Sequence, residues 1–170
     1  MKDFILQKIF VLIFSALSVG SNLVPNIAPT PSSPSEYRKI TKVIDGDTIE
    51  TDHFERIRYI GMNTPEIANK DKPDQCFALA AKQKNEELVL NKTVRLEKDV
   101  SETDKYKRLL RFVYVTRPNS NEIMVNQYLL QEGYAQLMSI PPDIAKADQF
   151  KKLQQEARIA QKGLWKECKK

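Results

Sequence analysis

Acidic and basic side chains alternate over a short stretch of this chain, in a pattern suited to holding a cation beside a phosphate. Residues 45–48 read Asp-Gly-Asp-Thr, Arg58 follows, and residues 63–66 read Asn-Thr-Pro-Glu. A further charged segment, TDKYKR, spans residues 103–108. Carboxylate and carbonyl oxygens are the ligands that calcium prefers, and arginines bind phosphate oxygens in a bidentate manner. The pattern favours chemistry at a phosphodiester, where the charge that develops as a bond to phosphorus breaks must be neutralised.

The order of these segments resembles the staphylococcal nuclease family over residues 37–165. Asp-Gly alone would carry little weight because it is a common turn dipeptide, but Arg58, the Thr-Pro-Glu run and Arg108 follow it in the family's order. The resemblance implies an α+β fold, a five-stranded OB-type β-barrel with three helices. It also implies a phosphodiesterase, a micrococcal-type endonuclease that hydrolyses DNA and RNA with low sequence specificity and leaves 3′-phosphates.

The resemblance assigns catalytic roles to three side chains. Arg58 and Arg108 would hold the phosphate and stabilise the transition state. Glu66 would act as general base on the attacking water, or orient it. Taken singly, each has a plainer interpretation, because an arginine on a strand is usually solvated and a loop glutamate is common.

The resemblance also implies a calcium cofactor, Ca2+, held by Asp47, Asn63 and the backbone carbonyl of Thr64. Asp45 more simply makes the turn. Asn63 departs from the family, whose best-known members place a second calcium-binding Asp at this position. Asn keeps one carbonyl oxygen but loses the charge, so we expect weaker calcium binding.

The substrate-binding positions of the family fall on Lys105 and Tyr106, where a cation would meet a phosphate and a ring would lie near the sugar or base. Lys107 stands where the family commonly has Gly, which leaves the local backbone conformation open. The base-stacking tyrosines of the relatives fall on Ser139 and Pro141. We therefore expect poor base stacking there and a different substrate preference.

The first part of the chain has the composition of an export segment. Lys2 and Lys8 precede an apolar run over residues 9–20, which predicts a signal peptide or N-terminal membrane anchor over residues 1–20. Residues 21–35 are rich in Pro and Ser and predict a linker, and residues 36–170 form the nuclease domain. We expect an extracytoplasmic protein, either secreted or tethered to the membrane by an uncleaved N-terminal segment.

The net charge of +5 suits a polyanionic partner, although charge alone does not identify one. The partners implied are DNA and RNA, single-stranded or locally open, and the family suggests a monomer. Two cysteines, Cys76 and Cys168, remain after export to an oxidising compartment and predict a disulfide. A pair of free thiols is the alternative.

Periodicity places the secondary structure. Alternating and β-rich runs predict strands at residues 37–44, 48–51, 56–60, 93–97 and 109–116. Helical spacing predicts helices at residues 76–90, around residues 125–132 up to Gly133, and at residues 145–161. These patterns alone support an α+β fold, and the barrel follows from the resemblance.

Two other functions compete with the enzyme. One is a non-catalytic OB-type nucleic-acid-binding module, which Asn63 and the missing tyrosines make plausible. The other is a tethered surface protein whose basic domain holds envelope polymers. The joint presence of Asp47, Arg58, Glu66 and Arg108 favours the enzyme, because carboxylates facing a phosphate would repel it without a metal.

Overall fold

Five strands close into a barrel within residues 36–68, 70–119 and 121–168, the parts of the chain that the structure, a computed structural model, describes. These strands are β1 (Glu36–Val43), β2 (Thr48–Thr51), β3 (Arg56–Tyr59), β5 (Thr93–Glu97) and β6 (Leu109–Thr116). They pair antiparallel in the order β3-β2-β1-β5-β6, and a parallel pairing of β3 with β6 closes the ring. The predicted fold class and all five predicted strands are confirmed.

The parallel closure decides which distant residues become neighbours. In its register Arg58 on β3 lies opposite Leu110 on β6. Arg108, which directly precedes β6, is thereby brought to the same end of the barrel as Arg58. Inside the barrel, the strands bury aliphatic and aromatic side chains that include Ile40, Ile49, Ile57, Val94, Leu96 and Phe112.

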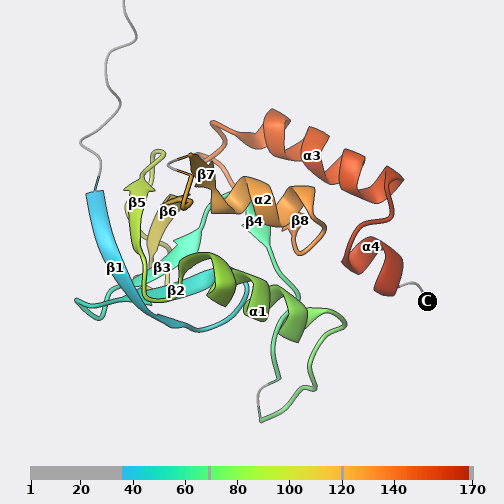
Figure 1. Ribbon diagram of the computed structural model, residues 1–170, viewed down its shortest axis with the longest axis horizontal. Coiled ribbons are helices and arrows are strands. Elements are labelled where there is room, and N and C mark those ends of the chain that lie inside the picture. The colour runs from blue at the N-terminus through green and yellow to red at the C-terminus, as the bar shows by residue number, and fades with distance from the viewer. Residues whose placement is uncertain (1–35, 69, 120, 169–170) are drawn as a thin grey trace, which may run out of the picture. The chain divides into compact units, whose positions relative to one another are not determined.

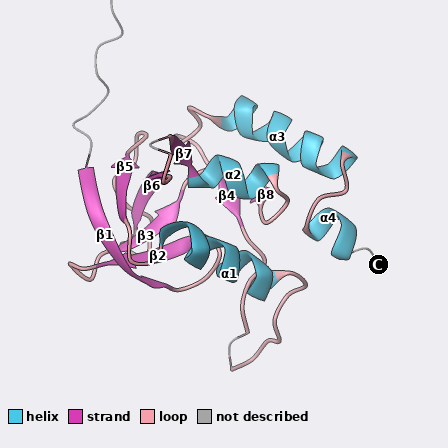
Figure 2. Ribbon diagram, viewed as in Figure 1, coloured by secondary structure: helices cyan, strands magenta, loops and turns pink. Residues whose placement is uncertain are grey.

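Four helices and three short strands complete the domain as described. The helices are α1 (Ala78–Val89), α2 (Val125–Gln131), α3 (Ala147–Ile159) and the one-turn α4 (Leu164–Glu167). The short strands are β4 (Met62–Asn63), β7 (Glu122–Met124) and β8 (Gln136–Leu137). In Figure 1, α2 lies between the strands and α3, and Figure 2 shows α4 at the side away from the barrel. The three predicted helices are present, and α4 is an addition.

The buried face of α1 differs from the prediction. Helical spacing from Phe77 predicts an apolar stripe of Phe77, Ala80, Ala81 and Leu88. The residues that are buried are Ala78, Ala81, Asn85 and Val89. Phe77 has a left-handed backbone with φ of 73° and precedes the helix, so the helix starts later and turns a different face inward, one that includes a polar residue.

The two cysteines are joined as predicted, and the disulfide links Cys76 to Cys168 across a sequence separation of 92 residues. It ties the segment before α1 to the end of α4. The predicted N-terminal segment and linker lie outside the described residues. Within the described ones, no helix has both the length and the apolar character needed to cross a bilayer.

The chain segments that follow α2 and α3 cross in close contact at two glycines. Gly133 ends α2 with φ of 73°, as predicted, and Gly163 follows α3 with φ of 49°. The N–H of Leu164 donates to the carbonyl of Gly133 at 2.9 Å. A Cβ on Gly133 would lie 2.3 Å from the Lys162 carbonyl oxygen, so only glycine permits this crossing.

Candidate active site

The turn between β1 and β2 presents Asp47 to the interior. The Asp45 carboxylate accepts from the backbone N–H of Asp47 at 3.0 Å, which fixes the turn as expected for Asp45. Gly46 is required for a second reason, because a Cβ there would lie 2.6 Å from the side chain of Thr64. The close approach of these two segments places Asp47 against Thr64.

Asp47 is a buried carboxylate whose partners, Thr48, Arg58 and Thr64, all belong to the sequence motifs identified above. Its side chain is 1% exposed and forms an ion pair with Arg58. One oxygen accepts from the Thr48 hydroxyl at 3.2 Å. The other accepts from the N–H of Thr64 at 2.8 Å and from its hydroxyl at 3.1 Å. A buried charge with these partners is stable where an unpaired one would not be.

Asn63 joins the same network. Its side-chain oxygen accepts from Arg58 Nη2 at 2.6 Å, and its Nδ2 donates to the Thr64 carbonyl at 3.0 Å. The oxygens of Asp47 and Asn63 therefore converge on one positive charge, the Arg58 guanidinium. The three residues expected to hold calcium lie in one cluster.

These oxygens fit a hard divalent cation, because carboxylate, amide and backbone carbonyl are all ligands that calcium accepts. These proposed ligands carry only one formal negative charge, that of Asp47. Within the described part of the chain, no three His, Cys, Asp or Glu side chains come together as a metal-binding group. A calcium ion held by Asp47, Asn63 and Thr64 would rely on one carboxylate and on water.

Arg108 is held by its own loop. Its Nε and Nη2 each lie 2.7 Å from Asp104 Oδ2, and Asp104 Oδ1 accepts from the N–H groups of Tyr106 and Arg108 at 2.8 and 3.0 Å. Burial would raise the pKa of Asp104, but these hydrogen bonds and the Arg108 charge lower it. Lys107 adopts φ of 63°, the left-handed conformation in which glycine is favourable, so the turn survives without glycine.

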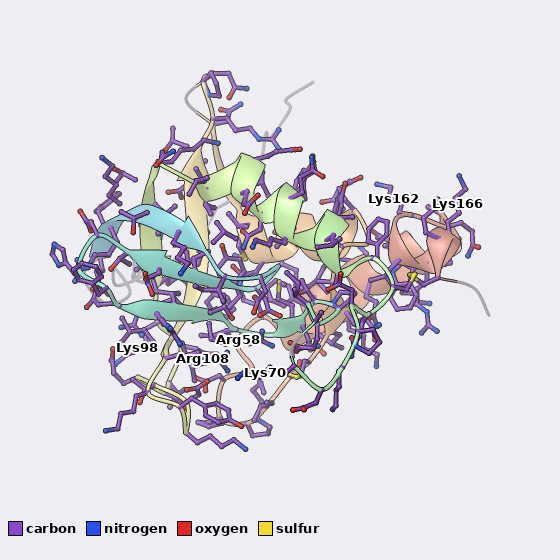
Figure 3. All side chains as sticks on the ribbon, turned by 90° about the horizontal axis from the view of Figure 1, so that it is seen from below. Arg58, Lys70, Lys98, Arg108, Lys162 and Lys166 are labelled. Atoms are coloured by element: carbon purple, nitrogen blue, oxygen red, sulfur yellow. A yellow bond between two sulfur atoms is a disulfide. The ribbon has the colours of Figure 1, made fainter. Side chains whose placement is uncertain are left out.

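The two arginines are close enough to affect each other. Burial lowers the pKa of Arg58, and the positive charge of Arg108 lowers it further, against the opposing effect of Asp45, Glu66 and Asp104. Figure 3 shows Arg58 and Arg108 near each other below the strands, with Lys98 and Lys70 on either side. Lys162 and Lys166 lie apart from them, next to α4. Two neighbouring cations of this kind are stabilised by an anion.

Both arginines line a cavity of about 580 Å³. Its polar wall includes Asp104 and the two predicted substrate-binding residues, Lys105 and Tyr106. Its rim carries the apolar side chains Met138, Ile140 and Pro141. Pro141 occupies the position where the resemblance places a base-stacking tyrosine of the relatives, and it lines the cavity. Aliphatic groups therefore form this side of the cavity. The volume is sufficient for a nucleotide.

Glu66 lies at the edge of this arrangement. It is exposed on the loop between β4 and α1, outside the cavity wall, while its charge acts on Arg58. Its backbone is fixed by Gln75, whose side-chain oxygen accepts from the Glu66 N–H at 3.0 Å and whose own N–H donates to the Glu66 carbonyl at 2.9 Å. Gln75 precedes Cys76, so the disulfide anchors the segment that holds Glu66.

Asn85 is a supporting residue that the sequence pattern did not reveal. From the buried face of α1, its Nδ2 donates to the Asp45 carbonyl at 3.1 Å, and its oxygen accepts from the Tyr59 hydroxyl at 2.8 Å. Burial raises the pKa of Tyr59, so its hydroxyl stays protonated. Asn85 connects α1 to the turn that presents Asp47. A polar residue in an otherwise apolar helical face is the signal that could have identified it.

The chain has clear relatives among known proteins. A family model described as staphylococcal nuclease homologue matches residues 56–167. Thermonuclease of Staphylococcus intermedius is 35% identical over 129 residues, covering 74% of each chain. Thermonuclease of Staphylococcus hyicus is 32% identical over 130 residues, covering 75% of this chain and 74% of the relative. Endonuclease YncB of Bacillus subtilis (strain 168) is 32% identical over 147 residues, covering 81% of this chain and 67% of the relative.

Proposed function

The chain belongs to the staphylococcal nuclease family and is a hydrolytic nuclease, and from this premise we propose that it is a calcium-dependent enzyme. It would cleave phosphodiester bonds of DNA and RNA with low sequence specificity and leave 3′-phosphates. The observation that carries the proposal is the convergence of Arg58 and Arg108 on one cavity, with Arg58 also paired to the buried carboxylate of Asp47 and bonded to the side-chain oxygen of Asn63.

The two arginines account for phosphate binding and for transition-state stabilisation. A phosphodiester in the cavity would accept hydrogen bonds from both guanidinium groups, and the mutual repulsion that lowers the pKa of Arg58 would be relieved. As water adds to phosphorus, negative charge grows on the oxygens that these groups contact. Preorganised positive charge is worth most at this moment because the site need not reorganise.

Glu66 is the base in this proposal. It is exposed and its charge acts on Arg58, so it would act on a water molecule that approaches the phosphate from its side of Arg58. The carboxylate would take one proton of the attacking water as its oxygen bonds to phosphorus, while the bond to the 5′-oxygen breaks and that oxygen takes a proton from solvent and leaves as a hydroxyl. The hydrogen bonds from Gln75 hold the backbone of Glu66 in place for this role.

Asp47, Asn63 and Thr64 would hold the calcium ion. When bound, the ion would supply additional positive charge beside the phosphate. The support is that the side-chain oxygens of Asp47 and Asn63 both contact the Arg58 guanidinium and that the Thr64 carbonyl lies 3.0 Å from Asn63 Nδ2.

We propose single-stranded or locally open nucleic acid as the preferred substrate. Lys105 and Tyr106 offer a cation and an exposed ring in the cavity wall, which is the combination that binds unpaired nucleotides without strong sequence preference. The apolar rim of Met138 and Ile140 would contact a base without stacking a ring on it.

Incubation of the purified protein with denatured DNA or with RNA, in calcium or in chelator, tests the function. We expect degradation only with calcium, and products whose new 5′-hydroxyl ends accept phosphate from a polynucleotide kinase. Arg108→Ala and Glu66→Gln should abolish most of the turnover. Retention of nucleic acid without cleavage in calcium would instead identify a non-catalytic binding module.

We also propose that the protein acts outside the cytoplasm, either secreted or tethered by an uncleaved N-terminus, as a monomer. The apolar run over residues 9–20 supports export, and the disulfide between Cys76 and Cys168 supports an oxidising compartment. Cell fractionation with N-terminal sequencing of the mature protein tests the location, and light scattering of the purified protein tests the oligomeric state.

A further inference from the structure

A second pocket adjoins the cavity of the proposed active site. Its volume is about 320 Å³, and its walls include Phe54, Glu55, Arg56 and Lys107. Two further wall residues, Tyr106 and Arg108, also line the first cavity. The two hollows therefore share residues that already belong to the proposed site.

Phe54 gives this pocket an exposed aromatic ring. It stands on the turn between β2 and β3, is 84% exposed, and has a backbone φ of 60°. An aromatic residue at positive φ is uncommon, and the ring makes none of the aromatic contacts found in the described part of the chain. Packing of the fold therefore does not explain a bulky apolar side chain here.

The turn nevertheless holds Phe54 firmly. The Phe54 N–H donates to the Thr51 carbonyl at 3.0 Å, and the Thr51 N–H donates to the Glu55 carbonyl at 3.0 Å. The Thr51 hydroxyl oxygen accepts from the N–H groups of His53 and Glu55, each at 3.2 Å. A ring presented by a fixed turn loses little freedom when a ligand stacks on it.

The charges around the ring are positive. Arg56 is 61% exposed, with only a long contact of 3.6 Å to Glu50. Lys107 is exposed, and no ion pair of the described residues involves its side chain. The one acidic wall residue, Glu55, is compensated because it accepts from Arg38 Nε at 2.8 Å. An exposed ring flanked by two available cations matches a base and its phosphate.

We propose that this pocket is a second nucleic-acid subsite, in which an unpaired base stacks on Phe54 and a backbone phosphate lies between Arg56 and Lys107. The proposal rests on the proposed function, since the bound strand would pass over Tyr106 and Arg108 from the cleaved bond into this pocket. The subsite would extend the contact with a single strand by a few nucleotides and would raise the affinity for longer substrates.

The test compares substrates of different length on the full-length protein. For a single-stranded oligonucleotide of about 12 nucleotides, Phe54→Ala should raise KM about tenfold with kcat unchanged, and Phe54→Trp should restore it. For a dinucleotide substrate, too short to reach the pocket, KM should not change. Tyr37→Ala removes an exposed ring that lies on β1, outside the pocket. It is the matched control and should behave as wild type.

A binding measurement separates this proposal from the nuclease function. In chelator, the anisotropy of labelled single-stranded DNA should show about tenfold weaker binding by Phe54→Ala, and Arg56→Gln should lower the salt dependence of binding. If Phe54→Ala binds more weakly but the wild type never cleaves, the subsite is supported and the nuclease function is refuted. Cleavage by a protein whose Phe54→Ala variant binds and cleaves long strands like wild type would refute the subsite.

Discussion

Removal of the disulfide should destabilise the domain substantially. In the chain-entropy model, a cross-link over a sequence separation of 92 residues removes unfolded-state entropy worth about 4.6 kcal/mol at 25 °C. For a domain of about 130 residues, an unfolding entropy of ~2.1 cal/mol/K per residue converts this into a Tm lower by roughly 17 °C. The double variant Cys76→Ser with Cys168→Ser applies the change without leaving a reactive thiol.

The same variant should lose activity before it unfolds. Cys76 follows Gln75, whose two hydrogen bonds fix the backbone of Glu66. When Cys76 is released from Cys168, the segment that carries these bonds has one anchor fewer. We therefore expect a lower kcat at temperatures where circular dichroism shows the variant still folded, with little change in KM because the arginines are held elsewhere.

Urea denaturation of the wild type and the double variant, each with and without reductant, measures the effect. The oxidised wild type should be the most stable of the four samples, and reduction should bring it to the level of the variant, which should not respond. Intact mass should rise by two hydrogens on reduction of the wild type. A variant within about 1 kcal/mol of the oxidised wild type would refute the entropy argument.

Four further changes test other parts of the structure. Asn63→Asp adds a charge to the proposed ligand set and should tighten calcium binding about tenfold by calorimetry; unchanged affinity would remove Asn63 from that set. Gly133→Ala meets a backbone oxygen at positive φ and should cost at least about 2 kcal/mol in denaturation. Arg108→Ala should lower turnover at least about 100-fold, and an unchanged rate would deny it a role in the reaction. Burial would raise the pKa of Asp143, but hydrogen bonds from Ser101 lower it. The stability it contributes should be full above its unfolded pKa and lost as pH falls through its depressed folded-state pKa, so the difference between wild type and Asp143→Asn should be largest at pH 7 and shrink as the solution becomes acidic.

Local sequence patterns were sufficient for the five barrel strands and the three longer helices but not for the way they meet. The alternation of Arg56, Ile57, Arg58 and Tyr59 identifies a strand, because side chains on a strand point to opposite faces. No local pattern shows that this strand pairs in parallel with β6. That pairing depends on closure of the whole barrel, and the barrel was predicted only from the family resemblance.

The candidate site was predictable where its residues lie in motifs and unpredictable where its support comes from elsewhere. The turn around Asp47 and the Asn63-Thr64 pair were assigned to one site by the family resemblance, and in the structure they contact each other. Asn85 was missed because its role depends on which face of α1 turns inward, a matter of tertiary packing. Gln75 was missed because a loop residue that hydrogen-bonds a backbone has no spacing signature.

The parallel pairing of β3 with β6 has a consequence for when the molecule can cut. Arg58 and Arg108 belong to segments that become neighbours only when β3 pairs in parallel with β6. A nascent or unfolded chain carries both guanidinium groups, but the distance between them changes with the conformation of the chain. It therefore offers a phosphate two independent charges, whereas the folded protein offers a fixed pair. The paired arginines therefore exist only in a chain whose barrel has closed.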